Sequence, residues 1–173
     1  SLLQYVPKDK RNFSDIFSVK AGRSSVYFQS PERIFRLTKK VSGKQVTWVC
    51  RAWDSKKGFG NIFYLDNTFF VQEWFTGLLK LNHDSLQIVP GCDTLKKISM
   101  SSMLPYTGFR GEKGVLLVTY NKGLYLFDGQ QTLPFHTEAD TILKKAVVSS
   151  AITIDSNYVL GTFDKGIIIM SPQ

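Results

Sequence analysis

The chain has 173 residues and a formal net charge of +8, with 43% hydrophobic and 13% aromatic side chains. This length and apolar content are enough for a substantial core, and no apolar run approaches the roughly 18 residues that a membrane-spanning helix needs. The two cysteines, Cys50 and Cys92, lack metal-ligand spacing, and we expect Cys50 to be a free thiol in an outer strand.

Short runs rich in β-branched and aromatic residues follow one another along the chain, and turn-forming residues separate them. The first run is similar to the outer-strand sequence at 85–91, which predicts a further outer strand at the start of the chain. The predicted strands group as follows: one outer strand at 1–7, four strands at 15–52, four at 60–90, four at 96–136 and three at 145–170. The stretch 137–145 predicts a loop with a helical turn.

These groups are copies of one repeat. Its anchor positions are separated by 44, 46 and 43 residues, and they are Arg33, Gly77, Gly123 and Gly166. An aliphatic residue follows each anchor, and a large apolar residue stands six positions before it. A period of roughly 40 to 50 residues built from short strands is typical of a β-propeller with one four-stranded blade per repeat. We therefore predict an all-β fold of about four blade equivalents in a single segment, 1–173.

The order of the predicted strands leaves two arrangements open. In one, residues 2–6 pair with the last blade and close a four-bladed ring. In the other, which we favour because most propellers have six to eight blades, the chain is an arc or fragment of a larger propeller. An open arc exposes a strand edge, which invites self-association through open blade edges.

Residues suited to catalysis are scarce. The two histidines, His83 and His136, have no partner at metal-ligand or catalytic-triad spacing, and no glycine-rich loop precedes a helix. Asp66 and Asp155 recur in phase with the repeat and indicate turns before the second strand of a blade. We therefore predict no catalytic residue, no metal site, no cofactor and no enzyme activity for this chain.

The turns between the second and third strands of each blade share one face of a propeller with the links between blades. The candidate ligand-binding residues on this face are Trp74, Tyr120, Lys122, Phe163 and Lys165 in the turns and Trp53 in the first link. Aromatic faces suit sugar rings, and Lys122 with Lys165 suits an acidic group. The alternative is that Trp74 and Phe163 pack on neighbouring blades. Because the basic residues are scattered in pairs, the charge does not favour nucleic acid as a partner.

The run from Asp155 to Ile167 resembles the two-component regulator propeller repeat, which has a Gly-Thr pair before a Gly-Leu pair and an aromatic residue. The segment 114–127 matches the later part of that repeat, and 66–79 matches it at Asp66-Asn67 and at Gly77-Leu78. The tryptophan that is usual in the second strand is absent from all of these copies.

The resemblance implies a non-catalytic, ligand-sensing propeller of a signal-transduction receptor of the histidine-kinase type. Such repeats lie in the periplasm or outside the cell, and they recognise ligands that are often oligosaccharides, so a small molecule or an oligosaccharide is the implied partner. A structural or protein-interaction propeller is the alternative, and it is favoured if the turns are tucked into contacts between blades. A propeller lyase or glycosidase is the third hypothesis, and it requires paired carboxylates or a histidine cluster in the central channel.

Overall fold

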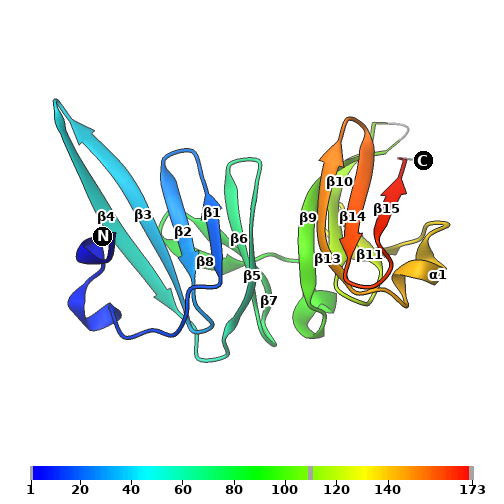
Figure 1. The fold of residues 1–173 in the computed structure, drawn as a ribbon, viewed down its shortest axis with the longest axis horizontal. Coiled ribbons are helices and arrows are strands. Elements are labelled where there is room, and N and C mark those ends of the chain that lie inside the picture. Colours follow the sequence, from blue (N-terminus) through cyan, green and yellow to red (C-terminus); the bar gives the residue numbers. More distant parts are fainter. Residues whose placement is uncertain (1, 109–110, 172–173) are drawn as a thin grey trace. The chain divides into compact units, whose positions relative to one another are not determined.

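A computed structural model describes residues 2–108 and 111–171, and within these ranges it contains fifteen β-strands, three short 3-10 helices and one short α-helix. The strands form four antiparallel sheets, in each of which neighbours in the chain are neighbours in the sheet (Figure 1). The prediction of an all-β chain with four blade equivalents is therefore confirmed.

Contacts divide the chain into two compact units, residues 1–75 with 79–87 and residues 76–78 with 88–173. Each unit holds two of the sheets. The strands of the first unit are β1 (Ser18–Ala21), β2 (Ser25–Gln29), β3 (Arg33–Ser42) and β4 (Gln45–Asp54) in one sheet, and β5 (Phe59–Leu65), β6 (Thr68–Glu73), β7 (Gly77–Asn82) and β8 (Ser85–Ile88) in the other.

The core of the first unit lies between its two sheets. In β2 and over most of β6, buried and less buried residues alternate, because successive side chains of a strand point to opposite faces. Tyr27 of the first sheet stacks on Phe69 of the second, with ring centroids 4.1 Å apart. The tight turn between β5 and β6 has positive φ angles of 48° at Asp66 and 59° at Asn67, as a two-residue hairpin requires.

The hairpin of β3 and β4 is longer than the sequence predicts. The ladder continues to the pair Ser42 and Gln45, so each strand has ten residues, and most side chains near the tip are exposed. Figure 1 shows this hairpin reaching beyond the shorter strands of its sheet. The added length places residues 50–54 inside β4, although we expected the link to the next blade to begin within them.

The predicted outer strand over residues 1–7 is wrong. Leu2–Tyr5 is a 3-10 helix, η1, followed by a second one, η2 (Lys8–Lys10), and Ser1 lies outside the described residues. The side chain of Val6 is buried, and Phe13 contacts Phe35 of β3 with ring centroids 4.9 Å apart. The N-terminal segment therefore covers the outer face of the first sheet with its apolar side chains instead of pairing along a strand edge.

The second unit contains β9 (Met100–Thr107), β10 (Lys113–Thr119), β11 (Leu124–Phe127) and β12 (Thr132–Phe135) in one sheet, and β13 (Val148–Ile154), β14 (Asn157–Thr162) and β15 (Ile167–Met170) in the other. A 3-10 helix, η3 (Asp93–Lys97), precedes β9. The α-helix α1 (Asp140–Leu143) lies in the link between the sheets, which confirms the predicted loop with a helical turn. The core between these sheets is built around Leu116, Val118 and Leu160, none of which is accessible to solvent.

Candidate functional site

The turn between β10 and β11 is held by one threonine. The backbone N–H and the side-chain hydroxyl of Thr119 both donate to the carbonyl oxygen of Gly123, at 3.2 and 2.7 Å. The same hydroxyl accepts a hydrogen bond of 2.8 Å from the backbone N–H of Lys122. The turn is therefore closed at both ends by a single side chain, and this fixes the backbone that carries Lys122.

The turn between β14 and β15 repeats this arrangement. Thr162 donates from its backbone and its hydroxyl to Gly166 at 3.0 and 2.8 Å and accepts from the backbone N–H of Lys165 at 2.8 Å. Gly123 and Gly166 have φ angles of 76° and 71°, in the left-handed region that favours glycine. These contacts explain why Thr-x-x-Lys-Gly occurs twice in the sequence.

The first blade departs from this pattern by one residue. Its turn is closed by Ser30, whose backbone N–H donates to the carbonyl oxygen of Arg33 at 2.8 Å and whose hydroxyl accepts from the Arg33 N–H at 3.1 Å. Because this turn is one residue shorter than the others, Arg33 does not have a positive φ angle. The arginine at the anchor position is therefore compatible with the fold of the turn.

The link between the two sheets of the second unit runs between the two threonine-closed turns. The backbone N–H of Val148 donates to the carbonyl oxygen of Tyr120 at 2.8 Å, and that of Phe163 donates to Val147 at 3.0 Å. The link residues Lys144 to Val147 are thereby attached to both turns. Tyr120 is half-buried, and its backbone carbonyl oxygen is the group that accepts the hydrogen bond from this link.

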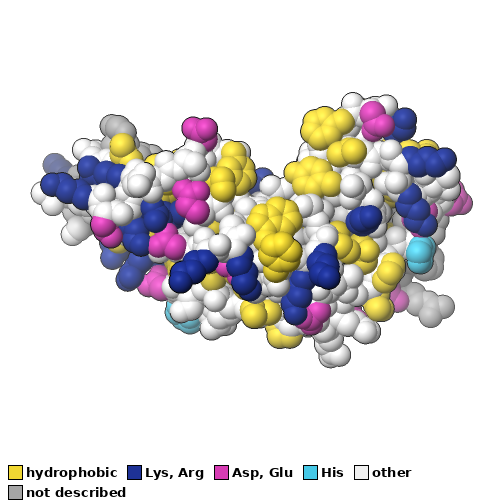
Figure 2. Space-filling model, turned by 90° about the horizontal axis from the view of Figure 1, so that it is seen from below, with side chains coloured by type: hydrophobic (Ala, Val, Ile, Leu, Met, Phe, Trp, Pro, Cys, Tyr) yellow, Lys and Arg dark blue, Asp and Glu magenta, His cyan; other side chains and the backbone are white. Residues whose placement is uncertain are grey.

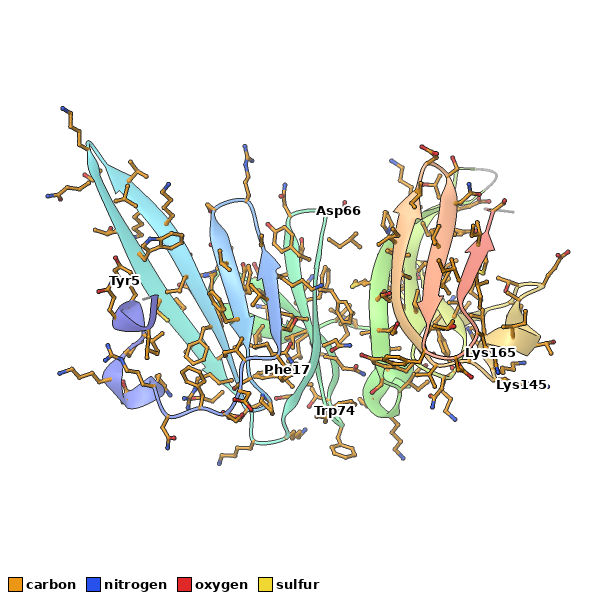
Figure 3. All side chains as sticks on the ribbon, in the orientation of Figure 1. Tyr5, Phe17, Asp66, Trp74, Lys145 and Lys165 are labelled. Atoms are coloured by element: carbon orange, nitrogen blue, oxygen red, sulfur yellow. The ribbon has the colours of Figure 1, made fainter. Side chains whose placement is uncertain are left out.

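We call the exposed side chains of these two turns and this link the turn patch, and its members are Lys122, Lys144, Lys145, Val147, Phe163 and Lys165. Phe163 is 77% exposed, although it is a large apolar residue. Lys165 lies 3.3 Å from Asp164, and among the described residues no carboxylate forms an ion pair with Lys122 or Lys145. Figure 3 shows Lys145 and Lys165 at the same end of the strands, and Figure 2 shows basic and hydrophobic side chains interspersed on that face.

Asp140 does not neutralise this patch fully. Its carboxylate accepts from the Thr137 backbone at 3.0 Å, lies 2.8 Å from Nδ1 of His136, and is 4.0 Å from Nζ of Lys144. The hydrogen bond with His136 and the one from Thr137 hold the pKa of the Asp140 carboxyl below its usual value, and this carboxylate stays ionised at neutral pH. The four lysines nevertheless outnumber Asp140 and Asp164, so the turn patch is basic with an exposed aromatic ring.

Trp74 does not offer its ring as a free platform. It is half-buried, its backbone N–H donates to Gly58 at 3.1 Å, and its ring lies 3.3 Å from the place that a Gly58 Cβ would occupy. Gly58 belongs to the link between β4 and β5. Ser55 of the same link also holds it to the turn after β6, because its hydroxyl donates to Glu73 at 2.6 Å. Trp74 therefore packs on the link between its blade and the preceding one, as the alternative interpretation of the sequence expected.

Trp53 is also engaged, and its predicted place in a link is wrong. It belongs to β4, where it pairs with Ile34, because the β3–β4 hairpin is longer than expected. Its indole N–H donates to the carbonyl oxygen of Asp84 at 3.0 Å, and the guanidinium of Arg36 lies 5.3 Å from its ring centroid. The indole thus connects the outer strand of one blade to the β7–β8 turn of the next.

Two exposed apolar side chains were missed by the sequence analysis. Phe75, next to Trp74 in its turn, is 70% exposed and has a φ angle of 61°. Val147 is 38% exposed in the link after the paired lysines 144 and 145. Both residues stand in segments that the repeat assigns to the turn face. The repeat does not show which of two adjacent apolar side chains is buried, because packing decides this.

Other chemistry is not indicated. Both cysteines are free, and burial raises the pKa of each thiol, which disfavours the reactive thiolate. Within residues 2–108 and 111–171 no group of histidine, cysteine and carboxylate side chains has the arrangement of a metal site. The helices of the described segments are all too short or too polar to span a bilayer.

Comparison with protein-family models and with curated proteins finds no match, so the resemblance to two-component regulator repeats stays a prediction from short motifs. A solved structure described as YCF48 bound to D1 peptide is similar over 97% of this chain and 67% of its own chain. The TM-score is 0.52 and the sequence identity 12%, which is evidence of a shared fold. YCF48 is a β-propeller protein. The chain therefore has a β-propeller fold, and its described residues form four blade equivalents, with three described strands in the last.

Proposed function

We propose that this protein is a non-catalytic, protein-binding β-propeller whose turn patch binds an acidic segment of a partner. The observation that carries the proposal is the pair of threonine-closed turns, which hold Lys122 and Lys165 on fixed backbone beside the exposed ring of Phe163. A preorganised surface loses little conformational entropy on binding. Aromatic side chains are enriched in protein interfaces, and charged side chains around them supply electrostatic complementarity to a partner of opposite charge.

A protein partner suits this surface better than an oligosaccharide. Sugar rings stack on the flat faces of tryptophan or tyrosine, but Trp74 packs on Gly58 and Trp53 on Arg36. Tyr120 is half-buried. Phe163 is the aromatic residue of the turn patch that remains exposed, and lysines flank it instead of the neutral hydrogen-bonding groups that sugars require.

The structural neighbour YCF48 is described with a bound D1 peptide, and this supports peptide binding as a use to which the fold is put. A role as the sensor of a signal-transduction receptor, in the periplasm or outside the cell, rests on the motif resemblance alone. Recognition of a protein segment by the turn patch is compatible with that role and does not depend on it.

The test uses a fluorescently labelled peptide that alternates glutamate with phenylalanine, titrated with the protein at several salt concentrations. We expect Lys122→Ala and Lys165→Ala each to weaken binding and to reduce its dependence on salt, because each removes a screened charge pair. Phe163→Ala should weaken binding without changing the salt dependence. Lys44→Ala is the matched control, since Lys44 is an exposed lysine of the β3–β4 turn, outside the turn patch.

Two results would contradict the proposal. Equal loss of affinity in the turn-patch variants and in Lys44→Ala would show that the peptide responds to net charge only. Complete competition by a sulfated oligosaccharide at lower concentration than the unlabelled peptide would assign the patch to a polysaccharide instead of a protein.

A further inference from the structure

The hairpin of β3 and β4 continues beyond the rest of its sheet. The ladder of β3 with β2 ends at Thr38, whereas its ladder with β4 runs on to the pair Ser42 and Gln45. In the sheet of β9 to β12, by contrast, both ladders of β11 end at the same residue, Phe127. We call the free part of the first hairpin, residues 39–48, the hairpin arm (Figure 1).

The hairpin arm is basic and contains no acidic residue. The chain has six lysine and arginine residues and no aspartate or glutamate over positions 33–53. Lys39, Lys40 and Lys44 are exposed, and in the part of the chain that the structure describes no carboxylate forms an ion pair with any of them. The positive charge of the arm is therefore available to an anionic partner.

These lysines surround the arm. Successive residues of a strand direct their side chains to opposite faces, so Lys39 and Lys40 lie on opposite faces, and Lys44 lies in the turn. A flat protein surface, or a further segment of chain packed on one face, would contact some of these charges and leave the others exposed. The headgroup layer of a lipid bilayer contacts all of them, because it surrounds a hairpin that enters it end-first.

Two valines are exposed near the tip of the arm. Val41 and Val46 pair directly across the ladder, and they are 64% and 49% exposed. Phosphate groups of a nucleic acid offer nothing to such side chains, whereas the boundary between headgroups and acyl chains removes their apolar surface from water. The valine pair therefore favours a bilayer over a nucleic acid as the anionic partner.

We propose that the hairpin arm binds the surface of an anionic lipid bilayer end-first, with Val41 and Val46 at the acyl boundary and the lysines against lipid headgroups. The long stem of Lys44 lets its ammonium group reach back to the headgroups from the turn. Tryptophan prefers the headgroup level, and Trp48 lies two residues behind Val46 on the same face. The proposal does not rest on the function of the turn patch, which consists of other residues.

The test measures sedimentation of the protein with vesicles of phosphatidylcholine, either alone or mixed with phosphatidylserine. We expect binding to the mixed vesicles to fall as salt is added and binding to the neutral vesicles to be roughly tenfold weaker or less. Lys39→Ala, Lys40→Ala and Lys44→Ala should each weaken binding to the mixed vesicles about fivefold. Lys80→Ala removes the same charge from an exposed position of β7 and is the matched control, with unchanged binding expected.

Further variants test the valine pair and the length of the arm. Val41→Ser combined with Val46→Ser should weaken binding about fivefold without changing its salt dependence, because the pair contributes apolar area and no charge. Val46→Trp should strengthen binding. Replacing residues 40–47 by Asn-Gly closes the ladder with a two-residue turn after the pair Lys39 and Trp48. This shortened protein should keep its circular dichroism spectrum and lose its preference for the mixed vesicles.

The proposal is overturned if neutral and mixed vesicles bind equally, or if the shortened protein binds the mixed vesicles as well as the original protein does. Lys122→Ala and Lys165→Ala should leave vesicle binding unchanged, and losses equal to those of the arm lysines would show a response to net charge only. Duplex DNA that displaces the mixed vesicles at a lower phosphate concentration, and that binds the valine double variant undiminished, would assign the arm to nucleic acid and contradict the proposal.

Discussion

Arg33 forms an ion pair with Asp54, and the same guanidinium group donates hydrogen bonds to the carbonyl oxygens of Lys10 and Asn12, at 2.9 and 3.0 Å. Asp54 in turn lies 2.5 Å from Nζ of Lys10. An arginine at the position where the other blades have glycine thus binds the end of β4 and the N-terminal segment together.

This cluster predicts a dependence of stability on pH. Hydrogen bonds from Lys10 and then from Arg33 hold the pKa of the Asp54 carboxyl below its usual value. A carboxyl whose pKa is lowered by folding stabilises the folded state above its unfolded pKa, about 3.9, and loses that contribution as the pH falls through the folded pKa. We expect Asp54→Asn to lower the free energy of unfolding by less than about 1 kcal/mol at pH 7, because the pair is partly exposed.

Urea unfolding of the original protein and Asp54→Asn between pH 7 and about pH 2 measures this effect. The difference between them should shrink toward zero at the acid end. Lys10→Met should reduce the effect of Asp54→Asn at pH 7, because one of the two cationic partners is then absent. If the difference in unfolding free energy between the original protein and Asp54→Asn is constant over the whole pH range, the carboxylate charge does not contribute to stability.

The N-terminal segment should stabilise the first sheet through Phe13. Its ring contacts Phe35 and is half-buried, so we expect Phe13→Ala to lower the free energy of unfolding by about 1 to 2 kcal/mol. Phe17, labelled in Figure 3, is 52% exposed, and Phe17→Ala is the matched control with an expected loss below about 0.5 kcal/mol. Thermal melts of both variants measure the two losses of stability. Equal losses would contradict our inference that Phe13 packs on the outer face of the first sheet.

The threonine hydroxyls should contribute to stability in the same way at both turns. Thr119→Val and Thr162→Val remove the hydroxyl but keep the β-branched shape, and each should cost about 1 kcal/mol because a donor and an acceptor lose their partner. Serine at either position keeps the hydroxyl and should restore most of the loss. Denaturant titrations in which serine and valine behave alike would show that the methyl group, not the hydroxyl, is what matters.

Gly166 should be required for its backbone conformation and not for space. In the described structure no atom beyond its sequence neighbours lies within 4 Å of the place that a Cβ would occupy, and its φ angle is 71°. Gly166→Ala should therefore cost about 1 to 2 kcal/mol, and Gly166→Asn less, because asparagine tolerates this region better. Unfolding experiments that rank asparagine below alanine would be inconsistent with a purely conformational cost.

Trp53 should act through its hydrogen bond to the β7–β8 turn. Trp53→Phe keeps an aromatic ring but removes the indole N–H that donates to Asp84, and it should lower stability by about 0.5 to 1.5 kcal/mol. Binding of the glutamate–phenylalanine peptide should not change. A loss of peptide affinity without a loss of stability would show that Trp53 is a binding residue.

The repeat made most of the strands predictable. The short apolar runs set the strands, and the anchor positions set their phase, so the four strands predicted at 60–90 lie within 59–88. The three described strands of the last blade also follow from the repeat. These features depend on local patterns that each blade contains in full.

The N-terminal segment and the aromatic side chains could not be predicted in the same way. The first residues have the apolar pattern of an outer strand, but the nearest apolar surface is the open face of Phe28, Phe35 and Leu37, which a sequence does not display. The repeat likewise assigns Trp74 and Phe75 to one turn without showing that the first packs on Gly58. Which side chains remain available for a partner depends on contacts between blades.

The threonine-closed turns have a consequence for how such a surface can change over generations. Thr162, the Lys165 N–H and Gly166 determine the course of the backbone, while Phe163 and Asp164 stand between them. Substitutions at these two middle positions change the side chains that the turn patch presents while leaving the hydrogen bonds that form the turn in place. Selection for a new partner is thereby largely uncoupled from selection for folding, and the same holds for the exposed Asn121 in the preceding blade.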